Sequence, residues 1–235
     1  MSNYSPSNYV LAAILGNWQG ESGINPGIWE GLIVPPGANP WEYQHTNNPS
    51  TGGYGLGQWT NVGTTHGRCY NVWYYLTSNG YAVDDGYGEC EFLEIEAYWT
   101  PSSLSNYHYQ TFSDFMNSSA TNVSYLTEDY MRCWEGIYTS DIANRRTYAA
   151  NWYNYLDSND ATWRTETQQP SWYAGNYYTS TSQQENNAKA AWWYFNMGGS
   201  PGPGPGPTPG TFPHLWLMFA FGKKIPKGYR KIRGN

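Results

Sequence analysis

A single glutamate stands where an amphipathic segment gives way to a turn rich in glycine and tryptophan. Residues 16–31 read GNWQGESGINPGIWEG, with Glu21 at the change in composition, and residues 52–60 read GGYGLGQWT. An acid that cleaves a glycosidic bond must hold a proton near neutral pH, and it needs aromatic faces and backbone amides beside it to bind a sugar chain. These residue types therefore predict a glycan-cleaving site with Glu21 as its general acid. The alternative is a solvated glutamate at a helix C-terminus, where its charge opposes the helix dipole.

The second string supplies the residues that we expect to bind the substrate. The side-chain amide of Gln58 both donates and accepts hydrogen bonds, so it either holds a water or a sugar amide or fixes its own Gly-rich loop. Tyr54 and Trp59 offer rings that can stack on sugars, although Trp59 can equally close the core under the groove. Gly55 adds a backbone amide that no side chain covers.

A second catalytic carboxylate is less well defined. Glycosidases normally use two carboxylates, and Glu30 and Glu42 fall in the segment that we expect to face Glu21. Asp84 and Asp85 are more remote alternatives, and each of the four can instead be a solvated loop acid. Some enzymes of this kind work with one glutamate and an oriented water, so the identity of the second group stays open.

The element that must position Glu21 is the first helix. We expect it to begin at Ser5, with Pro6 in its first turn, and to bury one stripe of side chains: Val10, Leu11, Ile14, Leu15 and Trp18. Glu21 follows Trp18 by three residues, so it projects from the same stripe at the helix end. A carboxyl on the core side is partly removed from water, which favours its protonated form.

The rest of the first 198 residues predicts a mainly helical domain. Further helices are expected over residues 67–79, 87–99 and 112–116, after Thr127, near Ser140, and from a capping box at Ser182 and Glu185 to about residue 195. Residues 31–65 and 157–181 are expected to be irregular, with a short hairpin in the first stretch. The fold class is therefore α+β, predominantly helical. The proximity of Arg145 and Arg146 to Glu135 favours a structural ion pair, with substrate contact as the alternative.

Composition and charge exclude several classes of partner. The chain has 13 Trp and 23 Tyr among 235 residues and is only 13% charged, unlike charge-rich disorder. Six basic residues oppose all 18 acidic residues before position 199, a net charge of −12 that excludes nucleic acid as the partner. No metal-ligand spacing appears, so neither a metal nor a cofactor is expected. Among the three cysteines, Cys69 and Cys90 are the most plausible pair.

The two ends of the chain differ from its body. Residues 1–7 are polar and the segment after them is amphipathic, so no signal peptide is expected. Residues 199–211 form a Pro/Gly linker, and residues 212–235 form a tail of ten apolar residues followed by six basic ones. The apolar run is too short to span a bilayer, which takes about 20 residues. We expect this tail to attach the domain to a larger particle or to a membrane or cell surface.

Five strings in order resemble the tail-associated lysozymes of bacteriophages, within the lysozyme-like superfamily. They are ILGNWQGESGINPGIWE at 14–30, GGYGLGQWT with Gly67-Arg68 after it, YLTSNGY at 75–81, an acidic helix at 89–96, and Trp134-Glu135 followed by ANRR at 143–146. Each string is weak alone, but their order is specific, and the resemblance covers about residues 9–157.

The resemblance implies a lysozyme-like fold over residues 1–198 with a small irregular or β-containing lobe. Glu21 matches the catalytic glutamate of the family, and Gln58 and Trp59 match its groove-lining segment. The implied reaction is hydrolysis of the β-1,4 bond between N-acetylmuramic acid and N-acetylglucosamine in peptidoglycan. A lytic transglycosylase and a non-catalytic glycan-binding tail component are the alternatives. The implied location is a phage virion tail, or release to act on the host cell wall, with phage tail proteins as possible partners of residues 212–235.

Overall fold

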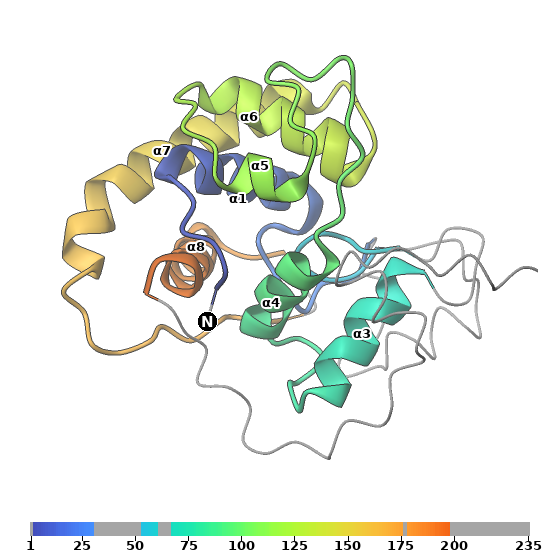
Figure 1. The fold of residues 1–235 in the computed structure, drawn as a ribbon. Coiled ribbons are helices and arrows are strands. Elements are labelled where there is room, and N and C mark those ends of the chain that lie inside the picture. The colour runs from blue at the N-terminus through green and yellow to red at the C-terminus, as the bar shows by residue number, and fades with distance from the viewer. Residues whose placement is uncertain (1, 31–52, 61–66, 176–177, 198–235) are drawn as a thin grey trace, which may run out of the picture.

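Helix α1 (Asn8–Ser22) lies at the centre of the molecule. Figure 1 shows it between α6 (Val123–Tyr130) and α7 (Ile142–Trp163) on one side and α8 (Thr181–Met197) on the other, and it packs most closely against α7. Every residue from 10 to 18 is buried, so the helix is enclosed well beyond the single predicted stripe. Small side chains allow this, since a methyl added to Gly16 would lie only 2.6 Å from Cβ of Ala149 on α7.

The computed structural model describes residues 2–30, 53–60, 67–175 and 178–197. Within these ranges the chain is mostly helical, which confirms the predicted fold class. Extended pairing in the described residues is limited to two isolated antiparallel bridges, Trp29 with Tyr54 and Tyr54 with Trp59. The hairpin was predicted within residues 31–65, of which 31–52 and 61–66 lie outside the described residues, as do the linker and the tail. The small β lobe is not confirmed.

The remaining helices form a second group and a connecting turn. Helix α3 (Arg68–Ser78) packs on α4 (Gly86–Glu96), and α4 packs on α8. The short helix α5 (Phe112–Met116) precedes α6, which runs directly into a π-helical turn, η2 (Met131–Glu135). The helix predicted to start after Thr127 therefore begins earlier, where the side chain of Asn122 caps α6. None of the helices that the structure describes is long and apolar enough to cross a membrane.

Two predicted helix starts are each displaced by two residues. The first helix is capped by Ser7, whose hydroxyl accepts from the Val10 amide, and not by Ser5. Helix α8 is capped by Ser180 and Gln183, whose side chains each accept from the other's backbone amide, and not by Ser182 and Glu185. The hydroxyl of Thr179 donates to the carbonyl of Gly23, and this tertiary contact fixes where the chain enters α8.

The core is built largely from aromatic rings. Four tryptophans are fully buried: Trp18, Trp59, Trp134 and Trp192. The predicted pairing of Cys69 with Cys90 is wrong, because both are free and buried, as is Cys133. Burial raises the pKa of the Cys69 thiol, and the negative charge of Glu89 adds to the shift. The thiolate that disulfide exchange requires is therefore disfavoured.

Candidate functional site

Glu21 lies in the last turn of α1, at the edge of the molecule. Gly23 ends the helix in the left-handed conformation, with φ of 64°, and its amide donates back to α1. The side chain of Glu21 is 21% exposed, so it reaches solvent although the helix behind it is buried. The hydroxyl of Ser22 lies 2.9 Å from the carbonyl oxygen of Trp18 and 3.0 Å from that of Leu56. The loop 53–60 is therefore docked beside Glu21.

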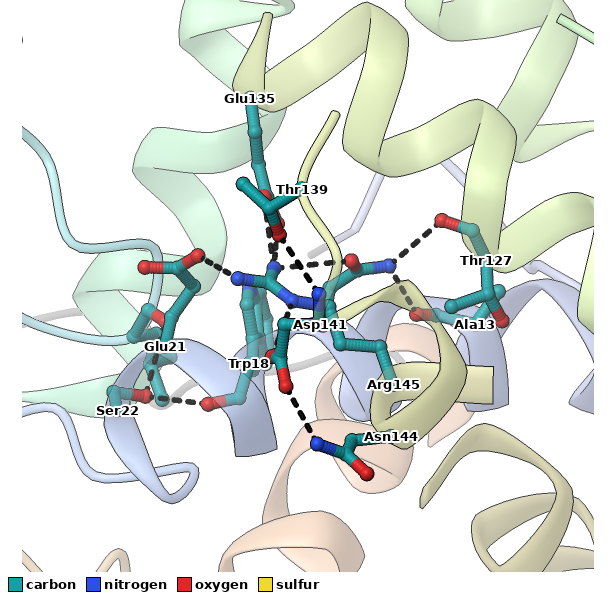
Figure 2. A network of polar contacts seen from close by, with 12 residues as sticks. Ala13, Trp18, Glu21, Ser22, Thr127, Glu135, Thr139, Asp141, Asn144 and Arg145 are labelled. Atoms are coloured by element: carbon teal, nitrogen blue, oxygen red, sulfur yellow. Dashed lines mark hydrogen bonds and ion pairs between the residues drawn. The ribbon is translucent and has the colours of Figure 1, made fainter. Parts of the chain in front are cut away.

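The guanidinium of Arg145 joins Glu21 to two other carboxylates. Figure 2 shows Nη2 directed at Glu21 and Nη1 directed at Glu135, with the Arg145 side chain only 6% exposed. Nη1 donates to both carboxylate oxygens of Glu135, at 2.9 and 2.8 Å, and Nε donates to Asp141 at 3.2 Å. One cation thus faces three acids, which come from α1, from η2 and from the residue before α7.

The buried side-chain amide of Asn17 also binds this guanidinium. Asn17, in the middle of α1, accepts from Arg145 Nη1 at 3.2 Å. Its own Nδ2 donates to the carbonyl of Ala13 at 2.9 Å and to that of Thr127 at 3.1 Å, so the amide cannot turn away. Since Arg145 is held by α1, η2 and its own helix, its position depends on how these elements pack.

Glu135 is the most strongly perturbed member of this cluster. Its side chain is 6% exposed, and burial together with the negative charge of Glu21 raises its pKa to about 8, although Arg145 and Arg68 oppose the shift. With its pKa raised to this range, the Glu135 carboxyl holds a proton at neutral pH. A carboxyl that holds a proton near pH 7 has the property that acid catalysis requires.

The backbone around Glu135 is unusual. It closes the π-helical turn η2, and Gly136 then reverses the chain with φ of 74°. A π turn inserts one extra residue into a helix, and such turns are frequent at functional sites. The turn points the Glu135 carboxylate at Arg145, which confirms the predicted ion pair for that arginine. Arg146 instead pairs with Glu128, so the prediction that both arginines serve Glu135 is wrong for Arg146.

The loop 53–60 depends on a second buried acid. Glu89, on α4, is fully buried and accepts from the Leu56 amide at 2.8 Å. Burial raises the pKa of Glu89 well above its usual range, and the negative charges of Asp85 and Asp84 add to the shift. Gly55 has φ of 72°, and a methyl added there would lie 2.5 Å from the carboxylate of Glu89. The loop therefore requires glycine at this position.

The structure places the predicted substrate-binding residues at different depths. Gln58 donates from Nε2 to the carbonyls of Gly55, at 2.9 Å, and Ile28, at 3.3 Å, so its amide fixes the loop. Trp59 is fully buried and donates to Glu96 at 3.1 Å, which is the core position that the sequence left open for it. Tyr54 is also buried, with its hydroxyl 2.7 Å from the carbonyl of Val83. Neither ring presents a free face to a sugar in this conformation.

The candidates for a second carboxylate that the structure describes lie in different environments. Glu30 is exposed and accepts from the Gly53 amide at 2.9 Å, which ties the strand-like segment after α1 to the loop 53–60. Glu42 lies outside the described residues. Asp84 and Asp85 line a separate pocket of about 490 Å³ between residues 80–87 and 169–174, which Glu21 does not line. Asp85 also caps α4 by accepting from the amides of Tyr87 and Gly88.

Three members of the Arg145 cluster are absent from the residues that the sequence predicts for the site. The sequence favours a structural role for Glu135, although an acid directly after Trp134 and ten residues before Arg145 is visible in it. Asp141 precedes Arg145 by four residues, the spacing of an ion pair on a helix. Asn17 is a polar residue within an apolar stretch, which is itself a signal. Across the ranges that the structure describes, no group of three or more metal-ligating side chains is placed to bind a metal.

Comparison with known proteins covers the same part of the chain. The family model described as phage tail lysozyme matches residues 2–156. This match includes Glu21, the loop 53–60, Glu135 and Arg145, and ends before α8. No curated protein matches the chain.

Proposed function

The chain belongs to the phage tail lysozyme family, and from this premise we propose that it cleaves the β-1,4 bond between N-acetylmuramic acid and N-acetylglucosamine with Glu21 as the general acid. The family suggests a peptidoglycan-lytic activity and a location in the phage tail or virion. One observation carries the residue assignment. Glu21 projects from the end of a buried helix, partly exposed, next to a docked Gly-rich loop and next to a carboxyl that holds a proton near neutral pH.

In the proposed reaction Glu21 protonates the glycosidic oxygen of the leaving sugar, while positive charge develops on the other sugar ring, which keeps the anomeric carbon. Water then attacks the anomeric carbon, which gives hydrolysis. Within the described residues, Gln58 Oε1 is a buried acceptor without a hydrogen-bond partner. This supports the proposal that Gln58 accepts from a sugar amide or from the attacking water once the substrate is bound. We propose that the backbone of Gly55 also contributes to substrate binding.

A second carboxylate is also proposed to take part in catalysis. Glu30 is the candidate within the described residues, because it is exposed and pairs with the loop 53–60. If Glu30 orients the water, Glu30→Gln lowers the rate of lysis without changing the stability of the fold. If one glutamate and an ordered water suffice, Glu30→Gln is as active as the wild type.

The experiment that tests the assignment is the isosteric change Glu21→Gln. It removes the proton donor but keeps size and polarity, so lysis of purified cell walls should fall by about 10²–10⁴-fold. Far-UV circular dichroism and the melting temperature should stay close to wild type. A folded Glu21→Gln protein with wild-type lysis would remove the central claim.

Mass spectrometry of the released fragments identifies the reaction type. Reducing ends indicate hydrolysis, whereas 1,6-anhydro ends indicate a lytic transglycosylase, in which the muramic 6-hydroxyl replaces water. Wild-type protein that binds walls but releases no fragments would support a glycan-binding tail component instead.

The proposal for the C-terminal part rests on its sequence. A chain that ends at residue 199 should digest purified walls nearly as fast as the full-length protein, because the Pro/Gly linker separates residues 1–198 from the tail. The tail is proposed to attach the domain to phage tail proteins or to a membrane or cell surface. Neutralising its six basic residues should weaken attachment at low salt and leave hydrolysis of soluble glycan unchanged.

A further inference from the structure

The cluster around Arg145 carries more acidic than basic groups. Glu21, Glu135 and Asp141 all contact the one guanidinium. Arg68 also faces Glu135, but its own side chain is committed to Glu96 through contacts of 2.7 and 2.9 Å. The three acids therefore compete for one cation.

The three acids differ in their access to water. The side chain of Asp141 is 40% exposed, that of Glu21 is 21% exposed, and that of Glu135 is 6% exposed. Ionisation costs most at the innermost position, because least water remains there to solvate the charge. The buried hydroxyl of Tyr130 faces Glu135 from α6 and supplies no positive charge. In the free protein the proton of the cluster therefore resides mainly on Glu135.

A sugar bound over Glu21 would remove the water that solvates its carboxylate, so the difference in burial between the two glutamates would become smaller. Arg145 cannot pass a proton, since its guanidinium keeps all of its protons, and exchange must proceed through solvent. The arginine instead stabilises whichever glutamate is charged, because it contacts both through different nitrogens.

We infer that Glu135 is a positioning residue for Glu21, acting through Arg145: it fixes the guanidinium that holds the Glu21 carboxyl. Glu135 accepts from Nη1 and Asp141 accepts from Nε, so the guanidinium plane is held at two nitrogens while Nη2 is directed at Glu21. The inference rests on the proposed role of Glu21 as the general acid.

The pH dependence of lysis by Glu135→Gln tests this inference. In the wild type Glu135 loses its proton near pH 8 and its charge then competes with Glu21 for Arg145, so activity should fall above that pH. In Glu135→Gln no second carboxyl repels the charge of Glu21. The alkaline limb of the activity profile, where activity falls at high pH, should then move to lower pH by about one unit or more. Much of the activity at about pH 5 should be retained. A merely structural role would lower activity at every pH without moving the limb.

The matched control is Glu128→Gln. Glu128 is another buried glutamate paired with arginine, seven residues earlier, and it does not contact Arg145. Its removal should leave the alkaline limb in place. If Glu135→Gln and Glu128→Gln both keep the wild-type limb, the inference is overturned. If both limbs move together, the shift reports a general loss of stability and the inference is also overturned.

A reciprocal measurement covers the case in which Glu135→Gln does not fold. In protein labelled with ¹³C at the glutamate carboxyls, the pKa of Glu135 should fall in Glu21→Gln, because the charge of Glu21 contributes to raising it. An unchanged Glu135 titration would overturn the coupling. The same Glu21→Gln sample separates the two claims: if it lyses walls normally the proposed function fails, whereas if it is inactive and Glu135 titrates unchanged only the inference fails.

Discussion

Two arginine–glutamate clusters lie next to each other in this molecule and have opposite charge ratios. Glu128, on α6, lies between Arg132 and Arg146. Burial raises the pKa of Glu128, but the hydrogen bond and charge of Arg132, together with the charge of Arg146, outweigh it and leave the pKa lowered. This acid stays ionised and joins α6, η2 and α7, so its role is structural.

The cluster around the neighbouring Arg145 has the reverse ratio. One cation faces three acids, and burial together with the charge of Glu21 raises the pKa of Glu135 instead of lowering it. Both clusters use the same residue types and consecutive arginines. The number of partners and the depth of burial therefore decide whether a glutamate acts as a bridge or holds a proton.

The largest difference is expected when each arginine is removed. Arg145→Met leaves buried carboxylates without a cation, which should cost about 3–5 kcal/mol of unfolding free energy and abolish lysis. Arg146→Met should cost about 0–1 kcal/mol, because its side chain is 33% exposed and Glu128 keeps Arg132. Urea unfolding at pH 7 measures both. Equal losses would mean that the two clusters do not differ in the way that their charge ratios indicate.

The pH dependence of stability should have opposite signs for the two acids. The folded pKa of Glu135 lies above its ordinary value of 4.5, so the native state keeps a proton that the unfolded chain has lost. Between pH 4.5 and about 8 the loss of this proton from the unfolded chain weakens the fold as pH rises. The stability of Glu135→Gln relative to the wild type should therefore increase with pH over this range.

Glu128→Gln should show the complementary pattern. The folded pKa of Glu128 is lowered, so its contribution is complete above its ordinary value of 4.5 and is lost as pH falls below it. The deficit of Glu128→Gln should be constant at neutral pH and shrink in acid. Urea unfolding between about pH 3 and 8 measures both variants. Parallel pH profiles for the two would contradict the comparison.

A smaller effect is expected where α1 meets α7. A methyl at Gly16 would lie 2.7 Å from the carbonyl oxygen of Arg145 as well as close to Ala149, so Gly16→Ala should separate the helices and cost about 1–3 kcal/mol. Glu21 and Arg145 lie on these two helices, whereas Glu128 and Arg146 do not involve α1. Lysis should fall together with stability in Gly16→Ala. A fully stable variant would show that the contact can relax.

The smallest loss of stability is expected for an exposed ion pair, which serves as a reference for the buried ones. Arg164 pairs with Asp160 on the last turns of α7, with the arginine side chain 52% exposed. Arg164→Ala should cost no more than about 0.5 kcal/mol, and high salt should remove part of this difference. Thermal unfolding at low and high salt measures it. A loss as large as that of Arg145→Met would mean that burial does not separate the ion pairs of this protein.

The sequence was sufficient to predict the local parts of this arrangement. The apolar spacing of the first helix and the glycines after Trp18 predicted that Glu21 would lie at a helix end near the core. The pairing of Arg145 with Glu135 was also predicted, because only ten residues separate them. Both features depend on contacts that form within a short stretch of chain.

The remaining parts depend on packing between distant elements. The contact between Glu21 and Arg145 spans 124 residues and exists only because α1 and α7 approach closely at Gly16. The sequence left open whether Trp59 lines the groove or closes the core, and the ring is in fact buried against Phe92 and Trp134. The π-helical turn has no sequence signature comparable to a cap, and the extra residue there is what directs Glu135 inward.

The enclosure of α1 predicts a pattern in amide hydrogen exchange. Since residues 10–18 are buried on every side, their amide protons can reach water only when the surrounding helices separate, so they should exchange at the rate of global unfolding. The amides of Glu21 and Ser22, in the last turn of the same helix, should exchange through smaller openings. The Glu21 carboxyl is thus attached to a helix whose buried turns should be the last to open.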